Sequence, residues 1–169
     1  KFQFATFSSQ LELFKAYRGK SQIAGMVDYL NRVDNKGQSY LSDALSKYRK
    51  IMRNRSYMVI ISDFLMPLDE IKKALYFLGK NHEVRVIQVL DKDERDLHLD
   101  GDTKLFDVES GEMLRTFVSP RLKSEYEAGM KAHRQEIEKI CGSLGFKFYT
   151  VYSDIPIFES FFRILKDKG

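Results

Sequence analysis

Apolar and polar residues follow two different spacings along this chain, and the spacings separate strands from helices. Tyr57–Ile61 and Val84–Leu90 are apolar almost throughout, and Phe146–Tyr152 is rich in aromatic and β-branched residues. Short runs of this kind favour strands that are covered on both faces, as in a parallel sheet. We therefore predict three parallel strands, with the strand at Tyr57–Ile61 buried on both of its faces.

Helical spacing, with apolar residues three and four positions apart, occupies the segments around these strands. The predicted helices cover Gln22–Val33, Tyr40–Arg55, Asp69–Lys80, Pro120–Leu144 and Ile155–Lys166. Ser21 and Ser39 are plausible N-caps for the first two. Ser119 followed by Pro120 is a strong helix start, and Gly145 is the expected stop.

Apolar and polar residues alternate in two segments, and this pattern predicts β-hairpins rather than helices. The first hairpin pairs Lys1–Phe7 with a strand beginning at Leu11, and the second pairs Lys104–Val108 with Met113–Val118. The order strand, helix, strand over residues 57–90 is typical of a βαβ unit with a right-handed crossover. The predicted fold class is α/β: one domain over residues 1–169 with a mostly parallel, doubly wound, Rossmann-like sheet flanked by helices.

Composition supports a folded domain and excludes several classes of protein. Hydrophobic residues make up 43% of the 169 residues, which is enough for a core, and no apolar run reaches the length of a membrane span. The single Cys141 excludes an internal disulfide framework and is typical of a reducing compartment, so we expect a cytoplasmic protein. Cys141 lies in a predicted helix, where a buried, unreactive thiol is expected. His133 lies on the apolar stripe of the same helix, and we expect it to be packed or half-exposed.

The charge pattern favours a solvated surface over a nucleic-acid interface. The net charge of +4 is short of a nucleic-acid signature, so no nucleic-acid partner is expected. A basic run at Lys47–Arg55 contains no acidic residue. We interpret it as a solvated helix face, with a partner-binding patch as the alternative.

Candidate chemistry follows the predicted parallel strands, because ligands bind beyond their carboxyl ends. Asp63 comes after the first strand and Asp91 after the second. The preceding helix matches the first strand in length, so its start at Ser39 should lie near Asp63. A hydroxyl and a carboxylate suit Mg²⁺. The same two residues are also explained as caps of a helix and a loop.

Two longer motifs, extended by several shorter ones in the same order, carry a resemblance to a known family. The segments are Gly37–Leu45 and Val59–Leu65, with Phe4–Ser9, Arg18–Lys20, His82–Val84, Gln88–Asp91, Leu105–Asp107 and Glu109–Glu112. In these the chain resembles the von Willebrand factor A-like proteins often encoded beside MoxR-type AAA+ ATPases, the family called domain of unknown function fifty-eight.

This resemblance implies a mostly parallel sheet between helices and a metal-ion-dependent adhesion site. Ser39 matches the hydroxyl ligand of that site and Asp63 matches its later aspartate. The Asp-x-Ser-x-Ser loop that supplies the other ligands is absent, and Ser62 does not replace it. We therefore expect an N-terminally incomplete domain without its central strand, with weak or no Mg²⁺ binding. Homodimerisation or strand exchange at the exposed edges is also expected.

We consider two functions as hypotheses. The first is a non-enzymatic protein-interaction module, with no catalytic residues, whose partner is a protein and by resemblance a MoxR-type ATPase. Ser62, Asp91 and Glu94 would join the partner-facing edge beside the site. The alternative is a Mg²⁺-dependent phosphoesterase or nuclease that uses Asp63, Asp91, Asp93 and Glu94.

Overall fold

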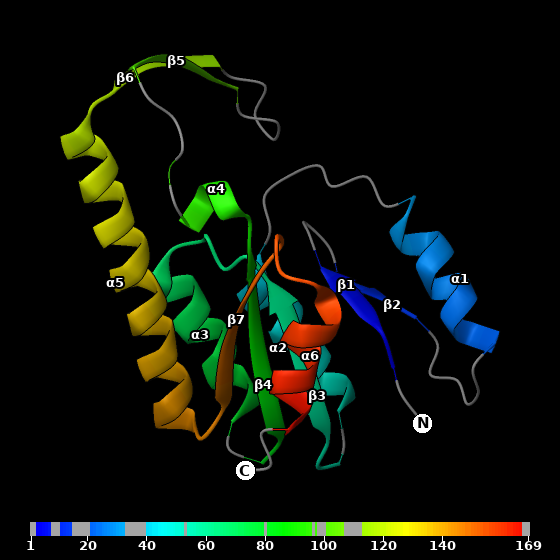
Figure 1. Cartoon of the computed structure of the whole chain (residues 1–169). Coiled ribbons are helices and arrows are strands. Elements are labelled where there is room, and N and C mark those ends of the chain that lie inside the picture. Colours follow the sequence, from blue (N-terminus) through cyan, green and yellow to red (C-terminus); the bar gives the residue numbers. More distant parts are fainter. Residues whose placement is uncertain are drawn as a thin grey trace.

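A three-stranded parallel sheet forms the centre of the molecule. We analysed a computed structural model, which describes residues 3–7, 11–14, 21–32, 40–52, 54–79, 81–95, 97, 101–106 and 113–166. The sheet contains β3 (Tyr57–Ser62), β4 (Glu83–Leu90) and β7 (Lys147–Tyr152), with β4 in the middle. Both pairings are parallel, so all three strands end at the same edge of the sheet, as Figure 1 shows. The three predicted parallel strands are confirmed.

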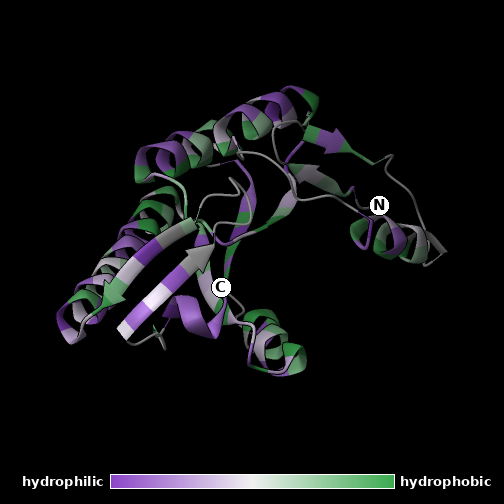
Figure 2. Cartoon of the chain, turned by 90° about the horizontal axis from the view of Figure 1, so that it is seen from above, coloured by the Kyte–Doolittle hydropathy of each residue, from purple (hydrophilic) through white to green (hydrophobic). Residues whose placement is uncertain are grey.

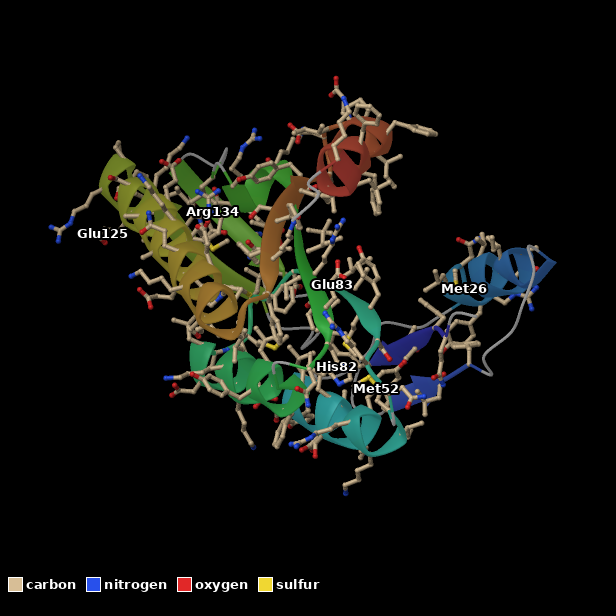
Figure 3. All side chains as sticks on the ribbon, turned by 90° about the horizontal axis from the view of Figure 1, so that it is seen from below. Met26, Met52, His82, Glu83, Glu125 and Arg134 are labelled. Atoms are coloured by element: carbon tan, nitrogen blue, oxygen red, sulfur yellow. The ribbon has the colours of Figure 1, made fainter. Side chains whose placement is uncertain are left out.

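Three helices cover one face of this sheet. They are α2 (Leu41–Ile51), α3 (Leu68–Leu78) and α5 (Pro120–Leu144). Their apolar sides meet the strands in one core cluster that includes Leu41, Ile71, Ile137 and Val86. The opposite face carries α6 (Ile157–Lys166), which Figure 3 shows across the sheet from α2 and α3. The structure is therefore α/β, with helices on both faces of a parallel sheet.

The prediction that residues 57–61 are buried on both faces is wrong. The side chains of Tyr57, Val59 and Ile61 are 53%, 43% and 52% exposed. On the same face of β4, Arg85 and Ile87 are buried. The reason is that α6 lies over β4: the Arg85 guanidinium donates a hydrogen bond to the carbonyl oxygen of Ile164 at 2.7 Å.

Two antiparallel strand pairs accompany the parallel sheet, as predicted. The first pair is β1 (Ala5–Phe7) with β2 (Leu11–Leu13), and the second is β5 (Gly101–Phe106) with β6 (Met113–Val118). The first pair contacts α1 (Ser21–Leu30), because the Tyr29 and Phe14 rings meet edge to face at 4.3 Å between centroids.

Helix boundaries follow local capping signals where the sequence provides them. The Ser119 hydroxyl accepts a hydrogen bond from the Leu122 amide at 3.2 Å, and Gly145 adopts a left-handed φ of +73°, so both predicted ends of α5 are confirmed. The helix α2 begins at Leu41 and ends at Ile51, before the predicted Arg55, because the next residue, Met52, has an extended backbone with φ −74° and ψ 113°. A short helix, α4 (Lys92–Arg95), was not predicted.

Candidate functional site

The loop after β3 presents Asp63 at the carboxyl edge of the sheet. Asp63 is exposed and follows the last residue of the strand, Ser62. Its Oδ1 accepts hydrogen bonds from the Leu65 amide and from the Ser62 hydroxyl, both at 3.3 Å. The Ser62 oxygen in turn accepts the Phe64 amide at 3.2 Å. These contacts make residues 62–65 a tight turn whose outward group is a carboxylate.

Two side chains from elsewhere in the fold hold this turn in place. Gln88, only 1% exposed in the middle strand, donates from Nε2 to the Asp63 carbonyl oxygen at 2.9 Å. The Nε2 of His133, on α5, lies 2.7 Å from the Phe64 carbonyl oxygen. A carbonyl only accepts, so this nitrogen of His133 is the protonated one. The loop is thus attached to both the sheet and the long helix.

Phe64 adopts a conformation that a bulky residue rarely takes. Its φ is +53°, in the left-handed region, while its side chain is fully buried in the core. Such a conformation is unfavourable for a residue with a Cβ and persists only where packing and hydrogen bonds impose it. Burial of the ring therefore fixes the direction in which the neighbouring Asp63 side chain leaves the sheet.

Asp91, the second carboxylate at this edge, caps the short helix α4. Its Oδ1 accepts the Asp93 amide at 3.0 Å and its Oδ2 accepts the Ser153 hydroxyl at 2.6 Å. Glu94 reaches back and accepts the Asp91 amide at 2.7 Å, which completes a reciprocal capping box. The Asp93 amide and then the Ser153 hydroxyl hold the pKa of Asp91 below its usual value.

The capping contacts give Asp91 and Glu94 structural roles. The hydrolase alternative uses both carboxylates together with Asp63, and no contact among the described residues favours that use. The sequence-predicted ligand Ser39 lies outside the described residues.

Among the described residues, Asp63 and Ser62 are the oxygen donors that the predicted magnesium site would use. Mg²⁺ takes six oxygen ligands in an octahedron, some of them water. Asp63 and Ser62 supply one carboxylate and one hydroxyl, and no group of three or more His, Cys, Asp or Glu residues in the described ranges is arranged to hold a metal ion.

The structure also describes the surroundings of three other sequence candidates. Cys141 is fully buried in the core, as predicted, and burial raises the pKa of its thiol to about 12. His133 is half-buried and packed, as predicted, but its contact with the Phe64 carbonyl has no signal in the sequence. The described basic residues of the run are exposed: Lys47, Arg49 and Lys50 lie on α2, and Arg55 lies beyond its end.

Gln88 and the turn at Phe64 are the site features that sequence reasoning missed. A signal for Gln88 was present, because it is the single uncharged polar residue in the apolar run Val84–Leu90. A buried amide needs hydrogen-bond partners, so its position pointed to a fixed polar contact beside the strand. The left-handed φ of Phe64 has no sequence signal, since glycine or asparagine is usual there.

In the described residues, no helix is long and apolar enough to cross a membrane. A solved structure of an aerotolerance-related membrane protein from Bacteroides fragilis, with multiple mutations to serines, matches 81% of this chain and 78% of its own length. The sequence identity in that match is 15% and the TM-score is 0.41.

Sequence comparison identifies relatives in mycobacteria. The uncharacterized protein MAV169 of Mycobacterium avium is 30% identical over 128 residues, which cover 76% of this chain and 75% of the relative. The uncharacterized protein Rv1480 of Mycobacterium tuberculosis is 32% identical over 114 residues, and the match covers 68% of this chain but 36% of that longer protein. Residues 2–136 match the family described as protein of unknown function DUF58, and the chain therefore belongs to that family.

Proposed function

We propose that this chain is a non-enzymatic protein-interaction module of the von Willebrand factor A-like type, which recognises its partner at the carboxyl edge of β3. The observation that carries the proposal is the exposed Asp63 carboxylate on a turn held by Gln88 and His133. A recognition group that is already oriented loses little conformational entropy when a partner binds. Leu65, 45% exposed in the same turn, adds an apolar contact beside the charge.

The proposed partner is a MoxR-type AAA+ ATPase, on the basis of the sequence resemblance at Gly37–Leu45 and Val59–Leu65. The Asp63 carboxylate would accept hydrogen bonds from donors on that partner. Mg²⁺ is expected to bind weakly or not at all at this edge, because the adhesion-site loop is absent from the sequence. Calorimetric titration of the chain with Mg²⁺, with and without the Asp63→Asn substitution, measures this directly.

A binding measurement tests the module. The purified chain is immobilised and a purified MoxR-type ATPase is passed over it, with and without nucleotide. We expect binding that Asp63→Asn weakens about tenfold, the effect of losing one charge-assisted contact of about 1.4 kcal/mol. Asp28→Asn on α1 is the control, because it removes the same charge from an exposed position outside the turn. Equal affinities of the two variants, or no binding by the parent chain, would contradict the proposal.

An activity assay distinguishes the interaction-module hypothesis from the hydrolase hypothesis. The chain is incubated with Mg²⁺ or Mn²⁺ and phosphoester, DNA or RNA substrates, and no turnover above buffer is expected. Turnover that disappears in both Asp63→Ala and Asp91→Ala would replace the interaction module with the hydrolase.

A further inference from the structure

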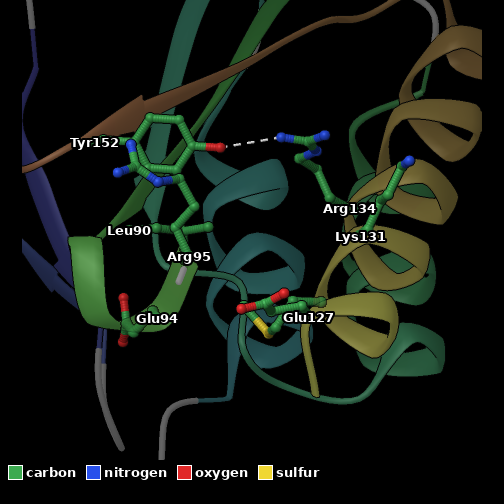
Figure 4. Close-up of a pocket in the computed structure, with 8 residues that line it drawn as sticks. Leu90, Glu94, Arg95, Glu127, Lys131, Arg134 and Tyr152 are labelled. Carbon is green, nitrogen blue, oxygen red and sulfur yellow. Dashed lines mark hydrogen bonds between the residues drawn. The ribbon is translucent and has the colours of Figure 1, made fainter. Parts of the chain in front are cut away.

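A pocket with several basic side chains lies at the carboxyl ends of β4 and β7, against α5. It encloses about 130 Å³. Its charged and hydroxyl-bearing lining consists of Glu94, Arg95, Glu127, Lys131, Arg134 and Tyr152, and Figure 4 shows these side chains around the opening. The carboxyl edge of a parallel sheet is the usual place for a ligand in α/β proteins. Asp63 does not line this pocket, so a ligand bound here would not depend on the role proposed for Asp63.

Tyr152 orients two guanidinium groups in the pocket. Arg134 donates from Nη1 to the Tyr152 hydroxyl oxygen at 3.0 Å, and the Arg95 guanidinium carbon lies 4.7 Å from the centre of the Tyr152 ring. Arg95 also lies 3.7 Å from the Asp154 carboxylate. Figure 4 shows the two guanidinium groups approaching Tyr152 from different elements. The positive charges are therefore positioned before any ligand arrives.

Donor groups remain available on α5 at the rim of the pocket. The contact of Arg134 with Tyr152 uses one of the five N–H donors of its guanidinium. Lys131 lies three positions earlier on the same helix and is exposed, and within the described ranges it has no hydrogen bond or ion pair. Residues three positions apart lie on one side of a helix, so both cations can reach the same oxygen anion.

The charged residues that line the pocket have a net value of +1, from three cations and the carboxylates of Glu94 and Glu127, and Asp154 beside Arg95 offsets part of it. Glu94 keeps its negative charge while it accepts the Asp91 amide, so both glutamates act on a bound anion. The two glutamates repel a carboxylate, with its single negative charge, less strongly than a phosphate dianion, so this lining favours a singly charged anion. Planar guanidinium groups also match the geometry of a carboxylate.

We propose that this pocket binds one carboxylate group, the side-chain end of an aspartate or glutamate in an acidic peptide segment. The pocket is large enough for a carboxylate with the carbon atoms that carry it, since a water molecule accounts for about 30 Å³ of liquid volume. Arg134 and Lys131 bind the two carboxylate oxygens, and Arg95 with Tyr152 forms the polar wall behind them.

The test is an NMR titration with a hexaglutamate peptide at physiological ionic strength, with a hexaglutamine peptide and inorganic phosphate as parallel titrants. We expect shift changes that centre on Arg134 and Tyr152 with the acidic peptide, and weaker binding of phosphate. Arg134→Gln and Lys131→Gln should each weaken peptide binding about tenfold, the loss of roughly one charge-assisted contact.

The matched control is Arg121→Gln, which removes the same charge from α5 at an 88% exposed side chain away from the pocket. It should leave peptide affinity within about twofold, because surface charges far from a ligand are screened by salt. Lys131 is exposed, so its substitution tests the pocket even if Arg134→Gln perturbs folding. Equal weakening by the control, phosphate binding tighter than the peptide, or no peptide binding would each overturn the proposal. Unchanged peptide affinity in the Asp63→Asn variant would show that the peptide binds in this pocket independently of Asp63 at the β3 edge.

Discussion

A single buried amide, Gln88, connects the middle of the sheet to the turn that carries Asp63. Its Nε2 donates to the Asp63 carbonyl, and its Oε1 lies 3.5 Å from the Thr150 hydroxyl of β7. Gln88 therefore bridges the strands on either side of its own. At the scale of residues, side chains that are distant in the sequence therefore help to hold the Asp63 turn in position.

Replacing this amide tests the bridge. Gln88→Met keeps the volume of the side chain but leaves the Asp63 carbonyl without its donor, so we expect a loss of about 1–2 kcal/mol in the free energy of unfolding. Urea denaturation measures it. Gln135→Met, at an exposed position of α5, should change stability by less than about 0.5 kcal/mol. A cost no larger than that of the Gln135 variant would show that the Gln88 contact is unimportant.

The Cys141 thiol predicts a pH dependence of stability at alkaline pH. Burial raises its pKa from 9.0 to about 12, so the folded state keeps the proton that the unfolded chain releases. Unfolding is therefore favoured as the pH rises above 9, by up to about 1.4 kcal/mol per pH unit until the pH reaches the folded pKa.

The measurement compares the parent chain with Cys141→Ala between about pH 8 and pH 10, a range that brackets the unfolded pKa. Other groups titrate in both proteins, so the difference between the two curves isolates the thiol. We expect the parent to lose about 1 kcal/mol more than the variant across this range. Parallel curves would contradict the raised pKa.

At the scale of elements, α5 connects the core, the turn and the basic pocket. Its buried residues Ile137, Cys141 and Leu144 join the core. One turn earlier, His133 and Arg134 contact the Phe64 carbonyl and the Tyr152 hydroxyl. The position of this helix along its axis therefore sets the geometry of both sites together.

The start of α5 at Ser119 fixes that axial position. Ser119→Ala removes the cap on the Leu122 amide and should lower the free energy of unfolding by about 1 kcal/mol. Ser119→Asp should restore most of it, because aspartate also caps and its charge suits the helix N-terminus. Ser124→Ala, at an exposed position inside the helix, should have no such cost. Thermal and urea unfolding of the parent and these variants measure the differences.

At the scale of the whole molecule, several large apolar side chains of β3 and α6 remain exposed, and we call this set the exposed apolar surface. It comprises Tyr57, Val59 and Ile61 on β3 with Ile157, Phe158, Phe162 and Leu165 on α6, all of them exposed. Figure 2 shows α6 largely in the hydrophobic colour, whereas α2 and α5 mix both colours. In the described part of the chain, β3 also has a strand neighbour on one side only. Exposed apolar side chains beside an open strand edge favour association.

We expect the chain to associate with itself at increasing concentration through this surface. Phe158 is 88% exposed and Phe162 is 59% exposed, so replacing both with Glu removes apolar area and adds repulsion at little cost to folding. Sedimentation velocity over a concentration series should show a larger species for the parent and monomer for the double variant. A parent chain that stays monomeric throughout would contradict this expectation.

Much of the fold was predictable because hydrophobic spacing and helix caps depend on residues that are close together in the sequence. The parallel strands, both antiparallel pairs and the ends of α5 all derive from such local patterns. The prediction from local patterns was wrong for the burial of β3, because its apolar run has the same composition as a strand covered on both faces. Only the place where α6 lies decides that β4 is covered and that one face of β3 is not.

Local sequence patterns were sufficient for most of the secondary structure, for the α/β class and for the positions of Asp63 and Asp91 after parallel strands. These properties depend on periodicity and on signals within a few residues of one another. Three features needed the folded chain: Gln88 and His133 hold the Asp63 turn, the Ser153 hydroxyl donates to Asp91 from the loop after β7, and basic groups from α4 and α5 meet at Tyr152. Most of these contacts join side chains from separate elements, and no local pattern encodes how those elements pack.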